Sequence, residues 1–267
     1  MARDDPLDLD GQVALVTGAG RGAGRAIALA LARHGAGGLA INDFAIDRAE
    51  AVAAEIEALG VRAAAVAADV GDRAAVGGMV ARVEATLGAP TILVNNAGNA
   101  GPEAAIGSSP PFWETDPDDW APYFRTNLDG VMNCVHATLP AMVAVGRGRI
   151  VTIVSDAGRV GEARLAAYSA AKAGAAGFMR AIAREVGRHA ITANCIALSA
   201  LEPQVDEAER AAFLASDRAR AQLSRYVIRR FGTPDDVAGM ALFLCSDAAA
   251  WITGQTYPVN GGYAFAQ

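Results

Sequence analysis

Tyr168 and Lys172 are four positions apart in the segment YSAAK. Residues at this spacing share one face of a helix, so the phenol and the ammonium would point into the same space. A nearby positive charge favours the ionised form of a phenol. The pair could therefore donate and accept protons, although the same spacing also occurs by chance on ordinary amphipathic helices.

Two further polar residues lie where they can join this pair. Ser155 ends the apolar run VTIVS shortly before Tyr168, and Asn127 lies in the segment TNLDG. We expect Ser155 to hydrogen-bond a substrate oxygen on which charge develops, and Asn127 to hold a water that links Lys172 to solvent. The four residues are typical of a site that removes the proton of a secondary alcohol, or returns it to a ketone, while a hydride moves to or from a nicotinamide.

This chemistry requires a phenolate near neutral pH. Bringing a tyrosine from a pKa of about 10 to about 7 requires about 4 kcal/mol of preferential stabilisation of the ionised form. The ammonium of Lys172, with the positive charge of an oxidised nicotinamide, is the expected source, so a lowered pKa is predicted for Tyr168. A serine hydrolase is not supported, because the sequence has no G-x-S-x-G segment and no serine–acid partner pattern for its histidines, His34, His136 and His189.

A glycine-rich turn, TGAGRGAG, directly follows the first apolar run, and a helical pattern begins at once. A diphosphate needs close backbone approach and free N–H donors at a helix N-terminus, which such a turn supplies. Glycines also mark bends that bind nothing, but the position between the first strand and the first helix favours cofactor binding. The residues predicted to bind the diphosphate are Gly18, Gly20, Arg21, Gly22, Ala23 and Gly24.

Asp43 is the candidate for discriminating between the two nicotinamide dinucleotides. It ends the second apolar run about 20 residues after the glycine turn, the interval at which an acid meets the adenosine ribose. Its carboxylate could accept from both ribose hydroxyls and would repel a 2′-phosphate, which favours NAD over NADP. Two alternatives stay open: Asp43 could only cap the following turn, and Arg21 could pair with a 2′-phosphate.

Residues after the third and fourth apolar runs extend the predicted cofactor site. Asp69 could accept from the exocyclic amine of adenine while Val70 packs against the ring. The segment NNAG, with Asn95, Ala97 and Gly98, places amide and small side chains where the chain turns beside the ribose. Considered alone, NNAG could simply form an Asn-Gly turn.

Short apolar runs alternate with longer helical patterns along the chain, which predicts an α/β fold with a parallel sheet. Strands are predicted over 12–17, 38–43, 63–68, 91–96, 149–155, 191–197 and 255–260, and helices over 22–35, 47–60, 72–88, 117–145, 168–188 and 234–246. Since no linker or repeat divides the sequence, residues 1–267 are predicted to form one Rossmann domain with a doubly wound seven-stranded sheet. Segments 97–117 and 198–226 look irregular, and the second would suit a mobile lid over a substrate.

The composition excludes several classes of protein. The 267 residues are 52% hydrophobic and 19% charged, as in an ordinary globular chain. A net charge of −6 without a basic cluster argues against a nucleic-acid partner. Because the acidic N-terminus lacks signal-peptide features and the apolar stretch 130–146 is short of the ~20 residues of a membrane span, we expect a cytoplasmic protein without membrane contact. No metal site is predicted, since the cysteines are far apart: Cys134, Cys195 and Cys245.

Together these motifs resemble those of the short-chain dehydrogenase/reductase family. The resemblance spans nearly the whole chain, from TGAGRGAG through NNAG, TNLDG, Ser155 and YSAAK to RFGTPDDVAGMALFLCSDAAAWITGQTYPVNGG. It implies one Rossmann domain, NAD(P)-dependent hydride transfer, and a homotetramer or homodimer formed through the two long helices after the fourth and fifth strands. The stretch IVSDAGRVGEARLAAYSAAK is similar to members that oxidise hydroxyacyl-CoA or alicyclic alcohol substrates.

Two departures from the family pattern concern the cofactor. The family usually has Ala-Pro-Gly after the sixth strand, followed by a threonine that contacts the nicotinamide amide, whereas this chain has Ala197, Leu198 and Ser199. By resemblance, Leu198 and Ser199 still border the nicotinamide. Ala23 replaces the larger aliphatic residue that is usual in the glycine motif. The alternative to an enzyme is therefore a cofactor-binding sensor or scaffold that has lost turnover.

Overall fold

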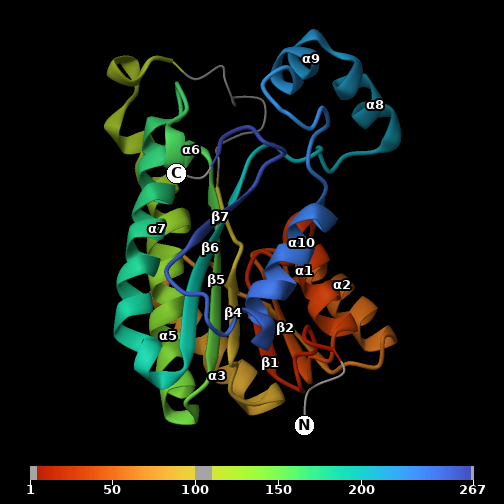
Figure 1. The fold of residues 1–267 in the computed structure, drawn as a ribbon, viewed down its shortest axis with the longest axis vertical. Helices are drawn as coiled ribbons and strands as arrows, with labels where there is room; N and C mark the ends of the chain where they lie inside the picture. Colours follow the sequence, from red (N-terminus) through yellow and green to blue (C-terminus); the bar gives the residue numbers. More distant parts are fainter. Residues whose placement is uncertain (1–4, 100–109, 266–267) are drawn as a thin grey trace.

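A computed structural model describes residues 5–99 and 110–265, and its centre is a sheet of seven parallel strands in the order β3-β2-β1-β4-β5-β6-β7 (Figure 1). The strands are β1 (Val13–Val16), β2 (Gly38–Asp43), β3 (Ala63–Ala67), β4 (Ile92–Asn95), β5 (Gly148–Ser155), β6 (Ile191–Leu198) and β7 (Thr256–Val259). The chain winds outward in both directions from β1 and β4, so the strand order reverses between these two. The predicted doubly wound, seven-stranded Rossmann sheet is confirmed, with boundaries that differ by a few residues.

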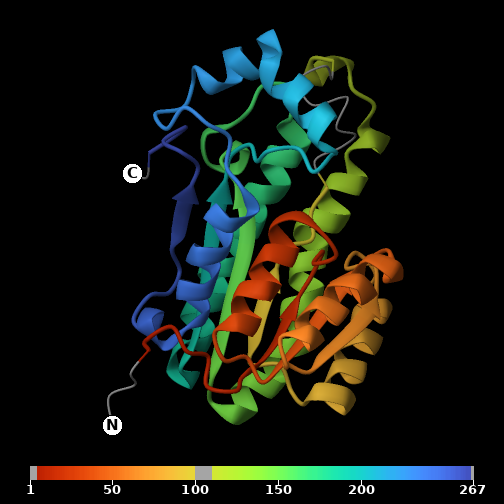
Figure 2. The ribbon, with the colours of Figure 1, turned by 90° about the vertical axis from the view of Figure 1, so that its right-hand side faces the viewer.

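Helices cover both faces of the sheet, which is why the strands read as continuous apolar runs (Figure 2). One face carries α1 (Gly22–Arg33), α2 (Ile46–Ala58) and α10 (Pro234–Cys245), and the other carries α3 (Arg73–Leu87), α5 (Gly130–Val145) and α7 (Ala166–Val186). Each layer encloses its own apolar core: Ile27 and Leu31 on the first face, and Val135 and Met179 on the second, are almost completely buried. Each such side chain contributes about 1.5–3 kcal/mol by leaving water.

The helix predicted over 117–145 is interrupted. The structure has a 3₁₀ turn at Pro117–Asp119, α4 at Ala121–Phe124, a π-helical turn at Arg125–Asp129, and then α5. A π turn adds a residue to the helical repeat and often occurs at functional sites; here it contains Asn127. Within the described part of the chain, the run Pro117–Val145 is the one helix long and apolar enough to cross a membrane, which is weak evidence, since α5 packs on the sheet beside α3 and α7.

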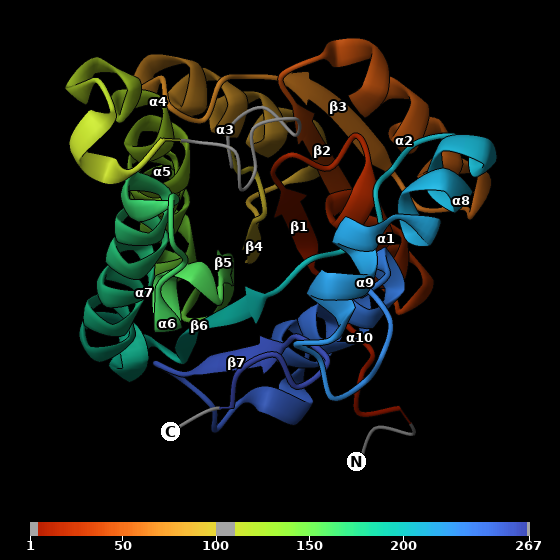
Figure 3. The same cartoon turned by 90° about the horizontal axis from the view of Figure 1, so that it is seen from above.

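The predicted lid segment, 198–226, is largely helical. It forms α8 (Glu207–Ala215) and α9 (Asp217–Leu223), whose N-termini are capped by the side chains of Asp206 and Ser216. Viewed from above, these helices lie over the α1 side of the carboxyl edge, opposite α4 (Figure 3). The remaining short helices are Phe112–Glu114, α6 (Ala157–Val160), Gly187–His189 and Asp247–Ala249.

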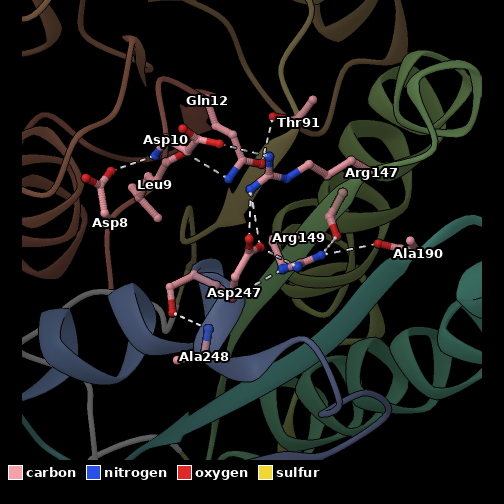
Figure 4. Close-up of polar contacts among 12 residues, drawn as sticks. Asp8, Leu9, Asp10, Gln12, Thr91, Arg147, Arg149, Ala190, Asp247 and Ala248 are labelled. Atoms are coloured by element: carbon pink, nitrogen blue, oxygen red, sulfur yellow. Dashed lines mark hydrogen bonds and ion pairs between the residues drawn. The ribbon is translucent and has the colours of Figure 1, made fainter. Parts of the chain in front are cut away.

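An ion-pair network lies at the amino-terminal ends of the strands and connects β5 to the segment after α10 (Figure 4). Arg149, only 5% exposed, donates to the Asp247 carboxylate at 2.9 Å and to the carbonyls of Gly148 and Ala190 at 2.9 and 3.2 Å. Arg147 also donates to Asp247, at 3.2 Å. Burial lowers the pKa of Arg149, and the Asp247 carboxylate partly offsets this shift. The network anchors β5 at the end opposite Ser155.

A candidate cofactor cleft and proton-transfer site

A cleft of about 560 Å³ opens where the strand order reverses. Open α/β sheets bind ligands at this position, outside the carboxyl ends of the strands. The predicted cofactor residues in its wall are Gly18, Arg21, Gly22, Asp43, Asp69, Val70, Ala97 and Gly98, and they are joined there by Asn42, Phe44, Arg48, Ala68, Asn96, Asn99, Thr126 and Gln204.

The glycine turn is built so tightly that a side chain would not fit at Gly18, Gly20 or Gly24. A Cβ on Gly18 would lie 2.8 Å from the Ala97 Cα, and a Cβ on Gly24 would lie 2.4 Å from the Gly18 carbonyl oxygen. Gly18 and Gly22 also have positive φ values, 59° and 57°, which L-residues with side chains rarely adopt. The turn therefore brings backbone, without side chains, to the edge of the cleft.

Helix α1 begins at this turn without a side-chain cap, because Arg21 at its N-cap makes no capping hydrogen bond. Uncapped N–H groups at a helix N-terminus are suited to an anion. The cleft therefore fits a dinucleotide diphosphate held by Gly18, Arg21 and Gly22. Ala23 and Gly24 were predicted to contact the cofactor, but neither lines the cleft: Ala23 packs on the core and Gly24 lies against Gly18.

Asp43 faces the cleft from the end of β2 and is largely buried. One carboxylate oxygen accepts from the Gly20 N–H at 3.1 Å, and the other accepts from the Ala45 N–H at 3.0 Å, with the Arg48 guanidinium 3.9 Å away. The turn-capping alternative is thus present in the structure, and it does not remove Asp43 from the wall of the cleft. Gly20 acts here by holding Asp43 and is not itself among the residues lining this cleft.

The NNAG segment is arranged differently from the prediction. Asn95 is buried behind the cleft, where its Nδ2 donates to the Thr152 hydroxyl at 3.1 Å. The neighbouring Asn96, which sequence reasoning missed, lines the cleft and donates from Nδ2 to the carbonyls of Thr17 and Gly18 at 3.0 and 2.9 Å. Asn96, the first residue after β4, therefore takes the place in the cleft wall that was predicted for Asn95.

Asp69 and Val70, which were predicted to contact adenine, line the cleft, and Asp69 already has partners within the protein. It accepts from the Gly71 N–H at 2.8 Å and forms a 2.6 Å ion pair with Arg125. Accepting from an adenine amine would require one of these oxygens to form an additional hydrogen bond. Val70 is buried and contacts α5 near Gly130.

Tyr168 and Lys172 share the face of α7 that looks toward the carboxyl end of β5. The Lys172 Nζ lies 6.0 Å from the centre of the Tyr168 ring and donates to the Ile153 carbonyl at 2.9 Å. Ser155 lies in the same cavity wall as Tyr168 and, as a hydrogen-bonding group, favours the ionised phenol. Three of the predicted proton-handling residues therefore lie together, on two elements that pack against each other.

In the protein alone the pKa of Tyr168 is raised, whereas the predicted lowering depends on Lys172 together with the positive charge of an oxidised nicotinamide. Burial disfavours the phenolate, and the hydrogen bond from Ser155 offsets only part of this effect. Lys172, 4% exposed, is itself affected by burial, which lowers its pKa from 10.5 to about 8. An ammonium about 6 Å from the ring thus does not overcome desolvation of the phenol in the protein alone.

Asn127 approaches Lys172 from the π-helical turn. Its Nδ2 donates to the carbonyls of Asn99 and Tyr123 at 2.7 and 2.9 Å, and its Oδ1 accepts from the Asn99 N–H at 3.1 Å. A Cβ placed on Gly98 would lie 3.3 Å from the Asn127 Oδ1 and 3.4 Å from the Lys172 Nζ. Because Gly98 has no side chain, the space next to the Asn127 Oδ1 and the Lys172 Nζ stays open.

Two cavities meet at Tyr168, and the predicted nicotinamide-loop residues belong to one of them. That cavity, of about 440 Å³, is lined by Ser155, Tyr168, Leu198 and Ser199 together with polar residues of α9 and the C-terminal segment. The Ser199 hydroxyl is hydrogen-bonded to the Tyr226 hydroxyl at 2.5 Å, which joins the end of β6 to the lid. The second cavity, of about 570 Å³, lies on the opposite side, against α4.

Several cleft residues could not be found from sequence alone. Phe44 and Arg48 follow Asp43 without any motif, and Gln204 comes from the lid. Asn96 belongs to the NNAG segment itself, so the motif contained it although the prediction chose its neighbour Asn95. Across 5–99 and 110–265, no cluster of three histidine, cysteine or acidic side chains could hold a metal ion, and all three cysteines are buried and free.

Comparisons with known proteins agree over almost the full chain. A family model described as Enoyl-(Acyl carrier protein) reductase matches residues 18–264. The 3-oxoacyl-[acyl-carrier-protein] reductase FabG of Pseudomonas aeruginosa is 38% identical over 96% of this chain and 98% of its own. The (2S)-[(R)-hydroxy(phenyl)methyl]succinyl-CoA dehydrogenase subunit BbsD of Thauera aromatica is 38% identical over 96% of this chain and 98% of its own.

A solved structure shows the same fold. The gluconate 5-dehydrogenase of Burkholderia cenocepacia, in complex with NADP and tartrate, superposes with a TM-score of 0.87 at 33% identity. The match covers 98% of this chain and 99% of that one.

Proposed function

The chain belongs to the short-chain dehydrogenase/reductase family of NAD(P)-dependent oxidoreductases, and we propose that it interconverts a secondary alcohol and a ketone with Tyr168 as the acid/base. The observation that carries this proposal is the position of Tyr168 in the walls of two cavities, with Ser155 in the wall of one and the buried Lys172 on the same helix face. A nicotinamide dinucleotide, when bound, donates or accepts the hydride and in its oxidised form adds positive charge near the phenol.

The roles of the four residues follow from their contacts. Tyr168 exchanges the proton of the substrate oxygen, and Ser155 donates a hydrogen bond to that oxygen as charge develops on it. Lys172 favours the phenolate electrostatically. Asn127, anchored by Asn99 and Tyr123, positions a water for proton exchange between Lys172 and solvent.

We propose NAD(H) as the preferred cofactor. Supporting this is the Asp43 carboxylate, which lies in the cleft wall at the end of β2 and would repel a 2′-phosphate. Arg21 and Arg48 line the same cleft and favour the alternative, NADP(H), as does the NADP bound to the gluconate 5-dehydrogenase. The test is calorimetric titration of NADH and NADPH into the wild type and Asp43→Ser. Tighter NADH binding, lost in the variant, supports the proposal, and tighter NADPH binding by the wild type contradicts it.

For the substrate we propose a hydroxyacyl or oxoacyl thioester, or an alicyclic alcohol. The names of the two relatives, an oxoacyl reductase and a dehydrogenase of a phenyl-bearing succinyl-CoA, support the acyl class. The polar cavity beside Ser155, with Gln222 and Arg225 in its wall, suits the carbonyl-bearing arm of such a substrate.

Tyr168→Phe tests the reaction itself. We expect turnover of ketone panels, followed by nicotinamide absorbance, to be lost while NADH binding stays within about twofold, because the phenol exchanges a proton without holding the dinucleotide. Tyr257→Phe, on β7 and outside the residues lining both cavities, serves as the matched control. Cofactor binding by the wild type without turnover across the panel would instead favour a silent sensor or scaffold.

We further propose a cytoplasmic homotetramer or homodimer formed through α5 and α7. Exposed apolar side chains on α5, among them Met132 and Val145, support this interface. Sedimentation velocity measures the assembly, and a monomer at micromolar concentration would contradict it.

A further inference from the structure

The larger cavity beside Tyr168 is lined by a different set of side chains from the cavity beside Ser155. Its wall is formed mainly by apolar and aromatic side chains, with Tyr168 at the inner end: Pro110, Phe112, Trp120, Pro122, Tyr123 and Leu165. The charged side chains among its described lining residues are Asp119 and Arg164. The apolar part of this wall favours an apolar occupant, because burying polar groups without partners costs free energy.

Three rings in this wall, Phe112, Trp120 and Tyr123, form what we call the aromatic shelf. Phe112 and Trp120 stack with centres 4.9 Å apart and planes 19° apart. The Tyr123 ring packs edge-on against Tyr168, at 6.3 Å and 69°. The shelf is therefore in direct contact with the proton-transfer phenol.

The indole of Trp120 presents its faces to the cavity, and its Nε1 donates to the Thr115 hydroxyl at 3.0 Å. Phe112 lines the same cavity and is 48% exposed, so part of its ring is open to an occupant. Stacked rings at an open face are the surface on which another flat or alicyclic ring packs best.

A carbonyl carbon at Tyr168 carries two substituents, and two cavities are available for them. The cavity beside Ser155 has hydrogen-bonding groups from Ser155, Gln222 and Arg225 in its wall, whereas the other has the rings of the aromatic shelf. One arm of the substrate should accordingly be polar and the other an apolar ring.

We propose that the aromatic shelf is a specificity site for an aromatic or alicyclic ring attached to the reacting carbon of the substrate. This inference rests on the proposed function, since it places the reacting carbon at Tyr168. The shelf then selects ring-bearing ketones over their methyl analogues by packing the ring against Trp120 and Phe112.

The test compares two β-ketoesters that differ only in one arm: ethyl 3-oxo-3-phenylpropanoate and ethyl 3-oxobutanoate. We expect kcat/KM of the wild type to favour the phenyl ester, and Trp120→Ala to lower kcat/KM for that ester roughly tenfold or more while changing the methyl ester less than about twofold. Trp113→Ala is the matched control, because Trp113 is 82% exposed and is not among the cavity's lining residues. Equal losses for both esters, or no preference in the wild type, would overturn the proposal.

A binding measurement separates this proposal from the proposed reaction. Calorimetric titration of 3-phenylpropanoate, which has no carbonyl to reduce, should show binding to the wild type and Trp113→Ala and a roughly tenfold weaker Kd for Trp120→Ala. If neither ester is turned over but this pattern holds, the ring site stands and the proposed reaction fails. Absence of phenylpropanoate binding to the wild type refutes the ring site. Phe112→Leu, a smaller change, repeats the test if Trp120→Ala melts early.

Discussion

Replacing the buried Lys172 by methionine should make the protein more stable at neutral pH while abolishing turnover. The pKa of Lys172 is lowered from 10.5 to about 8 by burial, and its ammonium is 4% exposed. At about 1.36 kcal/mol per pKa unit, holding it charged at pH 7 costs the fold about 3 kcal/mol. Loss of the hydrogen bond to the Ile153 carbonyl offsets about 1–2 kcal/mol of the gain.

The sign of this effect changes predictably with pH. Because the folded-state pKa is lower than the unfolded one, the cost is fully present below pH 8 and disappears as the pH rises past 10.5, where the lysine is neutral in both states. The stability advantage of Lys172→Met should therefore be about 2 kcal/mol smaller at pH 9.5 than at pH 7. Other titrating groups cancel, since both proteins share them.

Urea unfolding of the two proteins at both pH values measures the difference. Lys172 is also the only lysine in the sequence, so protein labelled with ¹³C-lysine gives one Cε signal whose titration reports the pKa directly. An advantage that is constant between pH 7 and 9.5, or an NMR midpoint near 10, would refute burial as the dominant influence on Lys172.

Three further predictions concern the frame around the site. Gly24→Ala should weaken NADH binding at least about tenfold in calorimetry and lower the free energy of unfolding by about 1–3 kcal/mol, because the new Cβ would lie 2.4 Å from the Gly18 carbonyl oxygen. Gly77→Ala is the control: this glycine of α3 faces open space, so its replacement should be neutral or stabilising. Arg149→Met should cost about 2–3 kcal/mol in urea unfolding, against less than about 1 kcal/mol for the more exposed Arg147→Met; equal losses would contradict a buried anchor. Asp236→Asn should destabilise α10 by about 1 kcal/mol at pH 7, because Arg230 first and then Thr233 hold the pKa of Asp236 well below its usual value. The wild-type advantage should start to shrink as the pH falls below 4 and still be partly present at pH 3, and an advantage that is the same at pH 7 and pH 2 would count against this assignment.

The fold was predictable because each strand is buried on both faces and therefore reads as an uninterrupted apolar run. The strand predicted over 38–43 matches β2 to the residue, since its six positions are all buried. The interruption of the helix predicted over 117–145 could not be predicted, because apolar periodicity does not distinguish a continuous α-helix from one containing the π-helical turn at Arg125–Asp129.

The positions of site residues were predictable where a motif determines the backbone conformation. They were less predictable where a side chain can form hydrogen bonds or ion pairs with several alternative partners. Gly18 and Gly22 lie in the cleft wall because the turn depends on their positive φ values. Asp69 pairs with Arg125, which is distant in sequence, and Asn95 points away from the cleft. The pKa of Tyr168 depends on how thoroughly the fold dehydrates the phenol, and spacing along a helix carries no information about that.

The unlike cavities on the two sides of Tyr168 also bear on handedness. A trigonal carbon whose polar and apolar arms can each enter only one cavity presents a single prochiral face to the dinucleotide cleft. Reduction would then yield one enantiomer of the alcohol, and the reverse reaction would consume only that enantiomer from a racemate. The enantiomeric purity of the product would then depend on the difference between the walls of the two cavities, and a substitution that makes these walls more alike would lower that purity.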